Sequence, residues 1–428
     1  MADTIFALAT ARGKAGVAVI RVSGPKALEA ASALGVQGLT PRRASLRDLV
    51  FEGDAIDSGI VIYFEPGRSF TGEKVVEFQI HGGESVVSAL LWSLERVPGL
   101  RLAEAGEFTR RALENGMMDL TQVEALADLI DSETEAQRRQ AQAVLKGAIG
   151  QKAAAWRKDL IRAAALIEAS LDFSEEDVPE NVVPEVLALV SGLRDAFRLE
   201  LTKSEGTERV RAGFEVAIIG APNAGKSSLL NALVGREAAI TSSIAGTTRD
   251  IIEVRMEIEG LAVTLLDTAG LRETEDEIEK IGVDRAKQRA EAADLRVLVL
   301  APEDLTDVPY WTEQDIVVRS KADLVPQEGA ISAKTGQGLD DLVKTIGLRL
   351  KDRVSGSGIL IRERHRAALK TAFESMESAR SSLYGEAPPL ELVAADIRMA
   401  AHALDLLVGK IGVETLLDEI FSSFCIGK

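Results

Sequence analysis

The chain has 428 residues, which is too long for one ordinary hydrophobic core, so two or three domains are expected. Its hydrophobic content of 46% excludes a disordered polypeptide. Its single cysteine, Cys425, excludes an intramolecular disulfide framework and fits a reducing compartment. The formal net charge of −17 excludes a protein that coats nucleic acid without specificity. Because the chain starts without a signal-peptide pattern and contains no bilayer-length apolar run, we expect a cytoplasmic protein that makes no membrane contact.

Short β-rich runs occupy the first block of the chain, residues 1–117. They cover residues 17–22, 60–64 and 75–80, and glycine and proline residues separate them. This pattern is typical of a compact α/β domain.

Helical patterns dominate residues 118–212 and return at 351–428. Apolar residues recur at helical spacing within 120–130, the stretch 135–171 contains no proline, and a further helix is expected over 185–201. Between these two blocks, residues 213–350 alternate short apolar strands with helices, which predicts a mostly parallel sheet. We therefore predict one discontinuous helical domain that carries an inserted α/β domain, with two separate helical domains as the alternative.

A phosphate-binding loop is predicted at residues 220–227, Gly-Ala-Pro-Asn-Ala-Gly-Lys-Ser, between a strand and a helix at 228–234. That context distinguishes a P-loop from a chance glycine-rich turn, because backbone N–H groups and the helix N-terminus must surround the phosphates. Lys226 is expected to reach the β- and γ-phosphates, and the Ser227 hydroxyl to ligate Mg²⁺. The loop residues predicted to contact the nucleotide are Asn223, Ala224, Gly225, Lys226, Ser227 and Ser228.

Two further segments have the composition of loops that close over the γ-phosphate and its metal. Asp267, Thr268, Ala269 and Gly270 follow a predicted strand, where an acidic side chain holds Mg²⁺ and a glycine N–H meets the γ-phosphate. Residues 246–250 lie between this segment and the P-loop, and Thr248 is the favoured second Mg²⁺ ligand there. The alternatives are an ordinary surface turn and a polar loop.

A base-binding pocket is predicted at residues 320–323 and 332–334. Asp323 is expected to accept hydrogen bonds from N1 and N2 of guanine, a donor pair that adenine lacks, so this carboxylate selects GTP over ATP. Ser320 stands where most GTPases have asparagine, and a hydroxyl cannot span the base as an amide does. The residues predicted to line this pocket are Ser320, Lys321, Asp323, Ser332, Ala333 and Lys334.

The group that orients the attacking water is not the usual one. Ras-type enzymes carry glutamine directly after the Asp-x-x-Gly loop, whereas this chain has Leu271. The following segment, residues 272–279, supplies five carboxylates, and residue chemistry by itself does not choose among them. A solvated acidic loop is the alternative interpretation.

The motifs at residues 222–228, 246–250 and 267–271, with the C-terminal Phe-Cys-Ile-Gly-Lys, resemble the MnmE (TrmE) family of tRNA modification GTPases. The segments 70–73 and 81–83 extend the resemblance over the whole chain. It implies an N-terminal folate-binding and dimerisation domain at 1–117, a helical domain at 118–212 and 351–428, and an inserted Ras-like G domain at 213–350. It also implies a homodimer that works with MnmG, an FAD-binding partner. Together they attach an aminomethyl or carboxymethylaminomethyl group to carbon 5 of the wobble uridine of certain tRNAs.

For hydrolysis, the resemblance implies that Glu279 positions the catalytic water and that K⁺ takes the place of an arginine finger. A fixed cation there neutralises charge that develops between the β- and γ-phosphates. From the residues alone, Asn223 could instead satisfy its own loop backbone. The implied K⁺ ligands are Asn223, Ser242, Ile244 and Thr247, and the implied nucleotide-contacting loop comprises Ser242, Ser243, Ile244, Ala245, Gly246, Thr247 and Thr248.

For the one-carbon donor, 5-formyl-tetrahydrofolate or a related tetrahydrofolate, the resemblance implies contacts from Arg21, Glu77, Lys428 and the position of Met117. A basic residue is usual where this chain has Met117. From the residues alone, Arg21 could be a surface strand residue and Glu77 a solvated strand position. Cys425 is either a thiol that modification requires, near the folate site, or a small apolar residue that packs the C-terminal tail.

Two functions are compatible with these motifs. The first is a GTP-hydrolysing tRNA-modification enzyme, and the second is a GTP-dependent ribosome-assembly switch of the Era type. The C-terminal pentapeptide and the N-terminal domain favour the first. The basic residues Arg362, Arg364, Arg366 and Lys370 could contact tRNA, although a solvated helix face is the favoured interpretation.

Overall fold

The computed structural model of the chain describes residues 3–172, 182–221, 223–235, 252–267, 288, 291–302, 312, 315–353, 358–384, 388–411 and 427. Its contacts divide the chain into two compact units. The first comprises Met1–Ala127, Gly150–Ala153 and Leu404–Lys428, and the second comprises Asp128–Ile149 and Ala154–Ala403.

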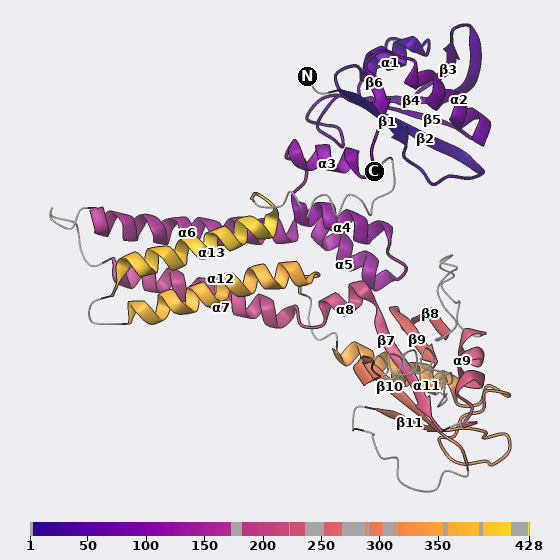
Figure 1. Cartoon of the computed structure of the whole chain (residues 1–428), viewed down its shortest axis with the longest axis vertical. Coiled ribbons are helices and arrows are strands. Elements are labelled where there is room, and N and C mark those ends of the chain that lie inside the picture. Colours follow the sequence, from indigo (N-terminus) through magenta and orange to yellow (C-terminus); the bar gives the residue numbers. More distant parts are fainter. Residues whose placement is uncertain are drawn as a thin grey trace, which may run out of the picture. The chain divides into compact units, whose positions relative to one another are not determined.

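The first unit is built on a six-stranded sheet with the strand order β3-β4-β5-β2-β1-β6 (Figure 1). Neighbouring strands are antiparallel, except that β1 and β6 run parallel. The predicted runs at 17–22, 60–64 and 75–80 lie within β2, β4 and β5, so the α/β prediction for this block is confirmed. The strands are β1 (Thr4–Leu8), β2 (Ala15–Ser23), β3 (Ser45–Phe51), β4 (Asp54–Phe64), β5 (Val75–Gly82) and β6 (Leu100–Leu102).

The two faces of this sheet have different coverings. Phe6, Ile20 and Phe78 belong to the large core that α1 (Ala27–Ala33) and α2 (Glu84–Glu95) complete. Side chains alternate between faces along a strand, so Ile5 belongs to the other face, where it packs with Phe108 of α3 (Glu107–Glu114). Cross-strand pairing places Ala7, Arg21 and Glu77 side by side on β1, β2 and β5. Arg21 and Glu77 therefore share the face that α3 covers.

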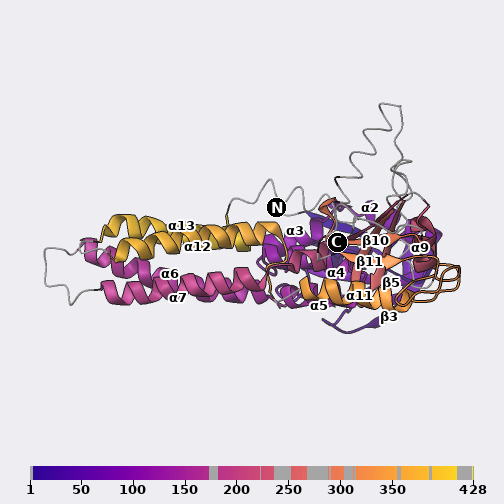
Figure 2. The same cartoon turned by 90° about the horizontal axis from the view of Figure 1, so that it is seen from below.

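Long helices form a bundle in the second unit (Figures 1 and 2). The Trp156 and Phe197 rings meet edge to face, with centroids 5.1 Å apart, which joins α6 to α7. The predicted stretch 135–171 is divided into α5 and α6 because Gly147 between them adopts a left-handed φ of 86°. None of the described helices is long and apolar enough to cross a bilayer. The helices of the second unit are α5 (Glu135–Leu145), α6 (Ala148–Asp172), α7 (Val183–Lys203), α8 (Thr207–Ala212), α12 (Glu363–Leu383) and α13 (Leu390–Val408). Most of α4 (Leu120–Ile130) belongs to the first unit, which includes this stretch up to Ala127.

The second unit also contains a five-stranded sheet with the order β11-β10-β7-β9-β8. Its pairs are parallel except for β8 with β9, so the prediction of a mostly parallel sheet is confirmed for the described part of the chain. Helices α9 (Lys226–Val234) and α11 (Leu339–Arg353) pack apolar residues into its core. The strands are β7 (Phe214–Gly220), β8 (Ile252–Ile258), β9 (Leu261–Asp267), β10 (Leu295–Leu300) and β11 (Ile316–Arg319).

Candidate functional site

The P-loop connects β7 to α9, as the sequence predicts. A Cβ on Gly220 would lie 2.3 Å from the Val299 carbonyl oxygen on β10, so glycine is required where the strand gives way to the loop. Asn223 and Gly225 adopt left-handed φ values of 65° and 99°, and α9 begins directly after them at Lys226. Left-handed residues in such a loop turn backbone N–H groups towards a common point, and the helix N-terminus adds partial positive charge. The loop backbone thus has the form of an anion cradle.

Lys226 is folded back onto this loop. Its Nζ donates hydrogen bonds to the carbonyl oxygens of Gly220 and Ala221, both at 2.9 Å. Burial lowers the pKa of Lys226, and the carboxylate of Asp267 at the end of β9 opposes that shift. Phosphate oxygens would form stronger, charge-assisted hydrogen bonds than these two neutral carbonyls. The ammonium group could therefore leave the carbonyl oxygens and bind a phosphate group instead.

Ser320 links the predicted base loop to the P-loop. It follows β11, and its Oγ donates a hydrogen bond of 2.6 Å to the carbonyl oxygen of Ala224, 96 residues earlier in the chain. The side chain is buried, and the Leu300 carbonyl lies 3.1 Å from the same oxygen. The sequence suggested that a serine here is deficient because it cannot span the base. The geometry shows that its hydroxyl is directed at the P-loop backbone.

Replacement Ser320→Ala is expected to destabilise the second unit by about 1–3 kcal/mol, because it leaves the buried Ala224 carbonyl without this donor. Thermal unfolding followed with and without GDP measures the loss. Thr345→Ala is a suitable control, since that exposed hydroxyl donates only within its own helix, to Asp341. Equal unfolding temperatures for the two variants would contradict a role for Ser320 in joining the loops.

Asp323 is held ready as a hydrogen-bond acceptor. The buried Ser332 hydroxyl donates to its Oδ1 at 2.7 Å, and this bond, aided by the charge of Lys334, lowers the pKa of Asp323. The Ala322 N–H donates to the Ile331 carbonyl oxygen at 3.0 Å, which joins the segments 320–323 and 331–334. The structure therefore brings together the two parts of the predicted base pocket, with an ionised, exposed carboxylate between them.

Other predicted nucleotide and metal residues lie outside the described part of the chain, as does the whole segment that was expected to position water. Within the P-loop helix, Ser227 and Ser228 occupy the first turn of α9. Residues outside the described part are Ser242, Ser243, Ile244, Ala245, Gly246, Thr247, Thr248, Thr268, Ala269, Gly270, Leu271, Glu279, Cys425 and Lys428.

A second candidate site lies on the α3-covered face of the first unit. The Nε of Arg21 is 2.9 Å from Oε1 of Glu77, and the side chains are 18% and 17% exposed. The Arg21 guanidinium carbon lies 4.8 Å from the ring centroid of Phe70 and 5.6 Å from that of Phe108. These contacts overturn the interpretation of Arg21 and Glu77 as solvated strand residues. They form a charged pair in an aromatic setting, which suits recognition of a polar heteroaromatic ring.

Close contacts at two glycines show where Met117 and the C-terminal motif lie in this unit. A Cβ on Gly72 would lie 3.0 Å from Cγ of Met117, which places that methionine beside the loop after Phe70. Gly427, with φ of 105°, lies so close to the Leu8 carbonyl that no Cβ fits. The C-terminal motif thus needs its glycine because the backbone approaches the end of β1. The segment 70–73 was part of the family resemblance, but the contact of Phe70 with Arg21 was not predicted, and Phe108 resembles an ordinary apolar position in the sequence.

The basic residues near the start of α12 were expected to lie on a solvated helix face, and Arg362 does not fit that interpretation. Nη2 of Arg362 is 2.7 Å from Oδ1 of Asp128, so this guanidinium is ion-paired and three-quarters buried. Lys370 is exposed, as a solvated helix face requires, and lies 3.9 Å from Glu374.

The chain is similar to known proteins over its full length. The family model "MnmE helical domain" matches residues 120–425, and "GTP-binding protein TrmE N-terminus" matches residues 4–117. The tRNA modification GTPase MnmE of Cereibacter sphaeroides ATCC 17029 is 58% identical and that of Ruegeria pomeroyi 56%, each with 100% of both chains covered. Among solved structures, Era of Aquifex aeolicus bound to GDP.AlF4- is 29% identical over 38% of this chain and 67% of its own. Its TM-score of 0.26 is too low to support an argument from structure.

Proposed function

Because the chain belongs to the MnmE family of tRNA modification GTPases, we propose that it couples potassium-activated GTP hydrolysis to modification of the wobble uridine of certain tRNAs. The modification adds an aminomethyl or carboxymethylaminomethyl group at carbon 5. The observation that carries the proposal is the joined P-loop and base loop in a chain whose full-length relatives bear this name. The ribosome-assembly alternative is not favoured, since the family matches include the N-terminal and helical regions as well.

The nucleotide part of the proposal assigns roles to residues of the P-loop and the base loop, to Asp267 and to Glu279. Lys226 and the N–H groups of the loop bind phosphate oxygens, and Asp323 with Ser332 selects guanine. The Ser227 hydroxyl and the buried Asp267 carboxylate are hard oxygen donors, which fit Mg²⁺, and the Asn223 amide oxygen fits K⁺. The cations supply positive charge where negative charge develops during transfer of the γ-phosphoryl group. Glu279 is proposed to orient the water that attacks.

The one-carbon half of the proposal rests on the Arg21–Glu77 pair. Adjacent donor and acceptor groups, flanked by Phe70 and Phe108, offer hydrogen bonds and ring contacts to a pterin. This supports binding of 5-formyl-tetrahydrofolate or a related tetrahydrofolate by the N-terminal domain. Lys428, Met117 and Cys425 are retained as proposed neighbours of the donor, and the position of Gly427 against Leu8 is consistent with a C-terminus that reaches this domain.

The proposed organisation follows from these sites. Residues 1–117 form the folate-binding and dimerisation domain, 213–350 form the G domain, and 118–212 with 351–428 form the helical domain. We propose that the protein forms a homodimer and that this homodimer works with MnmG, a partner that carries FAD. We propose that both act in the cytoplasm, because the substrate tRNA is encountered in that compartment.

The proposal is tested by analysing wobble nucleosides in a strain that lacks the gene. We expect the carbon 5 modification to be absent, to return with the wild-type chain, and to stay absent with Lys226→Ala, which removes the ammonium group that binds phosphate. Liquid chromatography with mass spectrometry of digested tRNA measures this outcome. A growth defect with intact wobble nucleosides would contradict the modification function.

A further inference from the structure

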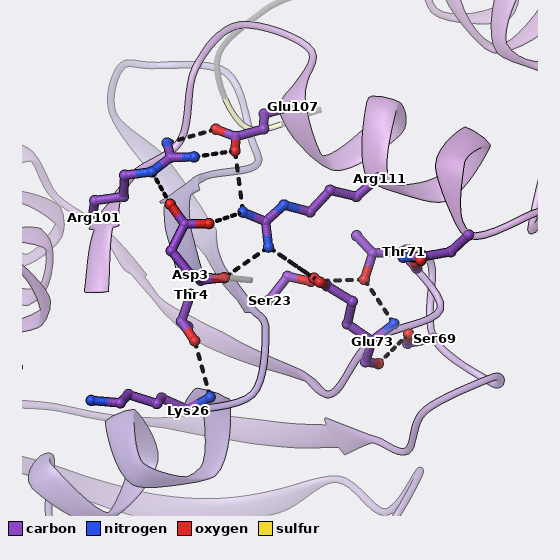
Figure 3. Close-up of polar contacts among 11 residues, drawn as sticks. Asp3, Thr4, Ser23, Lys26, Ser69, Thr71, Glu73, Arg101, Glu107 and Arg111 are labelled. Carbon is purple, nitrogen blue, oxygen red and sulfur yellow. Dashed lines mark hydrogen bonds and ion pairs between the residues drawn. The ribbon is translucent and has the colours of Figure 1, made fainter. Parts of the chain in front are cut away.

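A group of charged side chains in the first unit has no part in the proposed chemistry (Figure 3). We call it the Arg111 cluster, and its members come from the N-terminal segment, the loop 69–73, β6 and α3. Arg111 and Glu107 are buried, Glu73 is partly buried, and the side chains of Asp3 and Arg101 are more than two-fifths exposed. The cluster consists of Asp3, Glu73, Arg101, Glu107 and Arg111.

Arg111 lies at the centre of the cluster. Its Nη1 is 3.1 Å from Oε2 of Glu73 and donates to the Asp3 carbonyl oxygen at 2.9 Å. Its Nη2 lies 2.7 Å from Oδ1 of Asp3 and 3.2 Å from Oε1 of Glu107. One guanidinium therefore connects α3 with the N-terminal segment and with the loop 69–73, which the figure shows converging on it.

The surroundings of Glu107 and Arg111 favour the charged form of each. Burial acts to raise the pKa of Glu107, but hydrogen bonds from Arg101 and the Glu104 N–H outweigh it, so the pKa is lowered. Burial likewise acts to lower the pKa of Arg111, but the charges and hydrogen bonds of Glu73 and Glu107 together outweigh it, so the pKa is raised. A neutral replacement of Arg111 would remove the guanidinium from the partly buried Glu73 carboxylate, whereas Asp3 and Glu107 would keep Arg101 as their partner.

The loop 69–73 carries Phe70, the aromatic ring nearest to Arg21. Both neighbours of Phe70 are tied to Glu73: the Ser69 hydroxyl donates to the Glu73 carbonyl oxygen at 2.5 Å, and the Thr71 hydroxyl accepts from its N–H at 3.3 Å. The Ser23 hydroxyl donates to Oε2 of Glu73 at 2.7 Å. Ser23 lies two positions beyond Arg21 on β2, so the loop is fixed to the strand that carries the guanidinium.

We propose that Arg111 is a positioning residue for the one-carbon donor site. It holds Glu73, and with it the loop 69–73, so that Phe70 stays against Arg21 and Arg21 stays directed at Glu77. This inference rests on the proposed folate site. Arg111 touches no atom of the donor in this role and acts through Phe70.

Arg101 provides a matched comparison. It is an arginine of the same cluster that pairs with Asp3 and with Glu107, and its third contact is the Leu102 carbonyl oxygen. Arg101→Gln therefore disturbs the same carboxylates without removing a contact of the loop 69–73. Glu73→Gln is the converse variant, since it keeps the shape of the loop side chain and removes the charge that Arg111 meets.

The experiment measures binding of 5-formyl-tetrahydrofolate to the full chain by calorimetry, in wild type and in Arg111→Gln, Glu73→Gln, Arg101→Gln, Phe70→Ala and the double variant Arg111→Gln/Phe70→Ala. Arg111→Gln and Glu73→Gln are expected to weaken binding by up to about tenfold, the effect of no longer holding one aromatic contact in place. Arg101→Gln is expected to change it by less than about threefold. In the Phe70→Ala background, Arg111→Gln should cause no further loss, because its effect passes through that ring. Circular dichroism should be unchanged in all variants, which shows that the first unit folds, because GTP hydrolysis reports only on the second unit.

Hydrogen exchange of the backbone amides in 69–73 provides a second readout that does not need the donor. Arg111→Gln and Glu73→Gln should speed exchange there more than Arg101→Gln does. Equal folate binding by wild type and Arg111→Gln would overturn the inference, as would a full additional loss on top of Phe70→Ala. If the wild-type chain binds no folate, the proposed function fails. Exchange in 69–73 then decides the positioning role, and equal rates in Arg111→Gln and Arg101→Gln would reject it.

Discussion

Exchanging potassium for sodium in the assay is expected to lower the rate of GTP hydrolysis by about 10²–10³-fold, the usual effect of removing one element of transition-state charge stabilisation. The reason lies in the P-loop. This chain has Leu271 where a water-orienting glutamine is usual, so the proposed site depends on a cation at Asn223 and on Glu279. Steady-state phosphate release at constant ionic strength measures the rate. Glu279→Ala should abolish most of the activity in potassium.

Asn223→Gly is the sharpest variant for the cation site. Asn223 has a left-handed φ of 65°, a conformation that glycine adopts without strain, so the substitution removes the amide and keeps the loop. Activity in potassium should fall to the level that wild type shows in sodium, while GDP affinity stays close to wild type. Asn223→Ala would add backbone strain and is therefore less informative. Potassium and sodium giving equal rates for the wild-type chain would contradict the cation-assisted mechanism.

Asp323→Asn is expected to weaken GTP binding by about 100-fold and to shift preference towards xanthosine triphosphate. The carboxylate accepts from N1–H and the N2 amino group of guanine, and each such bond to a charged acceptor contributes about 1.5–3 kcal/mol. Xanthine keeps N1–H and has a carbonyl at C2, so an amide can accept from one and donate to the other. Competition of both triphosphates against a fluorescent GDP analogue measures the preference.

The control for this prediction is Ser332→Ala. It removes the hydroxyl that donates to Oδ1 of Asp323 but leaves the carboxylate, so GTP should remain preferred. Its pKa effect has a clear sign. The hydrogen bond from Ser332 holds the pKa of Asp323 below its ordinary value. The stability that this bond contributes is therefore complete at neutral pH, and it is lost as the pH falls through that lowered pKa. Unchanged GTP affinity in Asp323→Asn would mean that the base pocket lies elsewhere.

Local patterns predicted many of the strands but not all of them, and the buried strand β1 was among those missed. The runs that became β7, β9 and β10 are nearly continuous apolar segments, as strands inside a parallel sheet require, whereas β5 alternates apolar with polar residues. Edge strands β3 and β8 were not predicted, since polar residues interrupt them. The break between α5 and α6 depends on the conformation of Gly147, which a helical pattern with good propensity conceals.

The sequence by itself determined the nucleotide chemistry, and only the tertiary structure decided how the supporting groups are arranged. A P-loop can be recognised from eight consecutive residues because its cradle is made by its own backbone and the helix that follows. Ser320 acquires its role only through a carbonyl 96 residues away, and Arg21 pairs with a glutamate 56 residues away. Strand register sets those neighbours, and register is a property of the assembled sheet. The contacts of Arg111 with Asp3 and Glu73 depend on how α3 packs against the N-terminal segment and the loop 69–73, which no local pattern of the sequence shows.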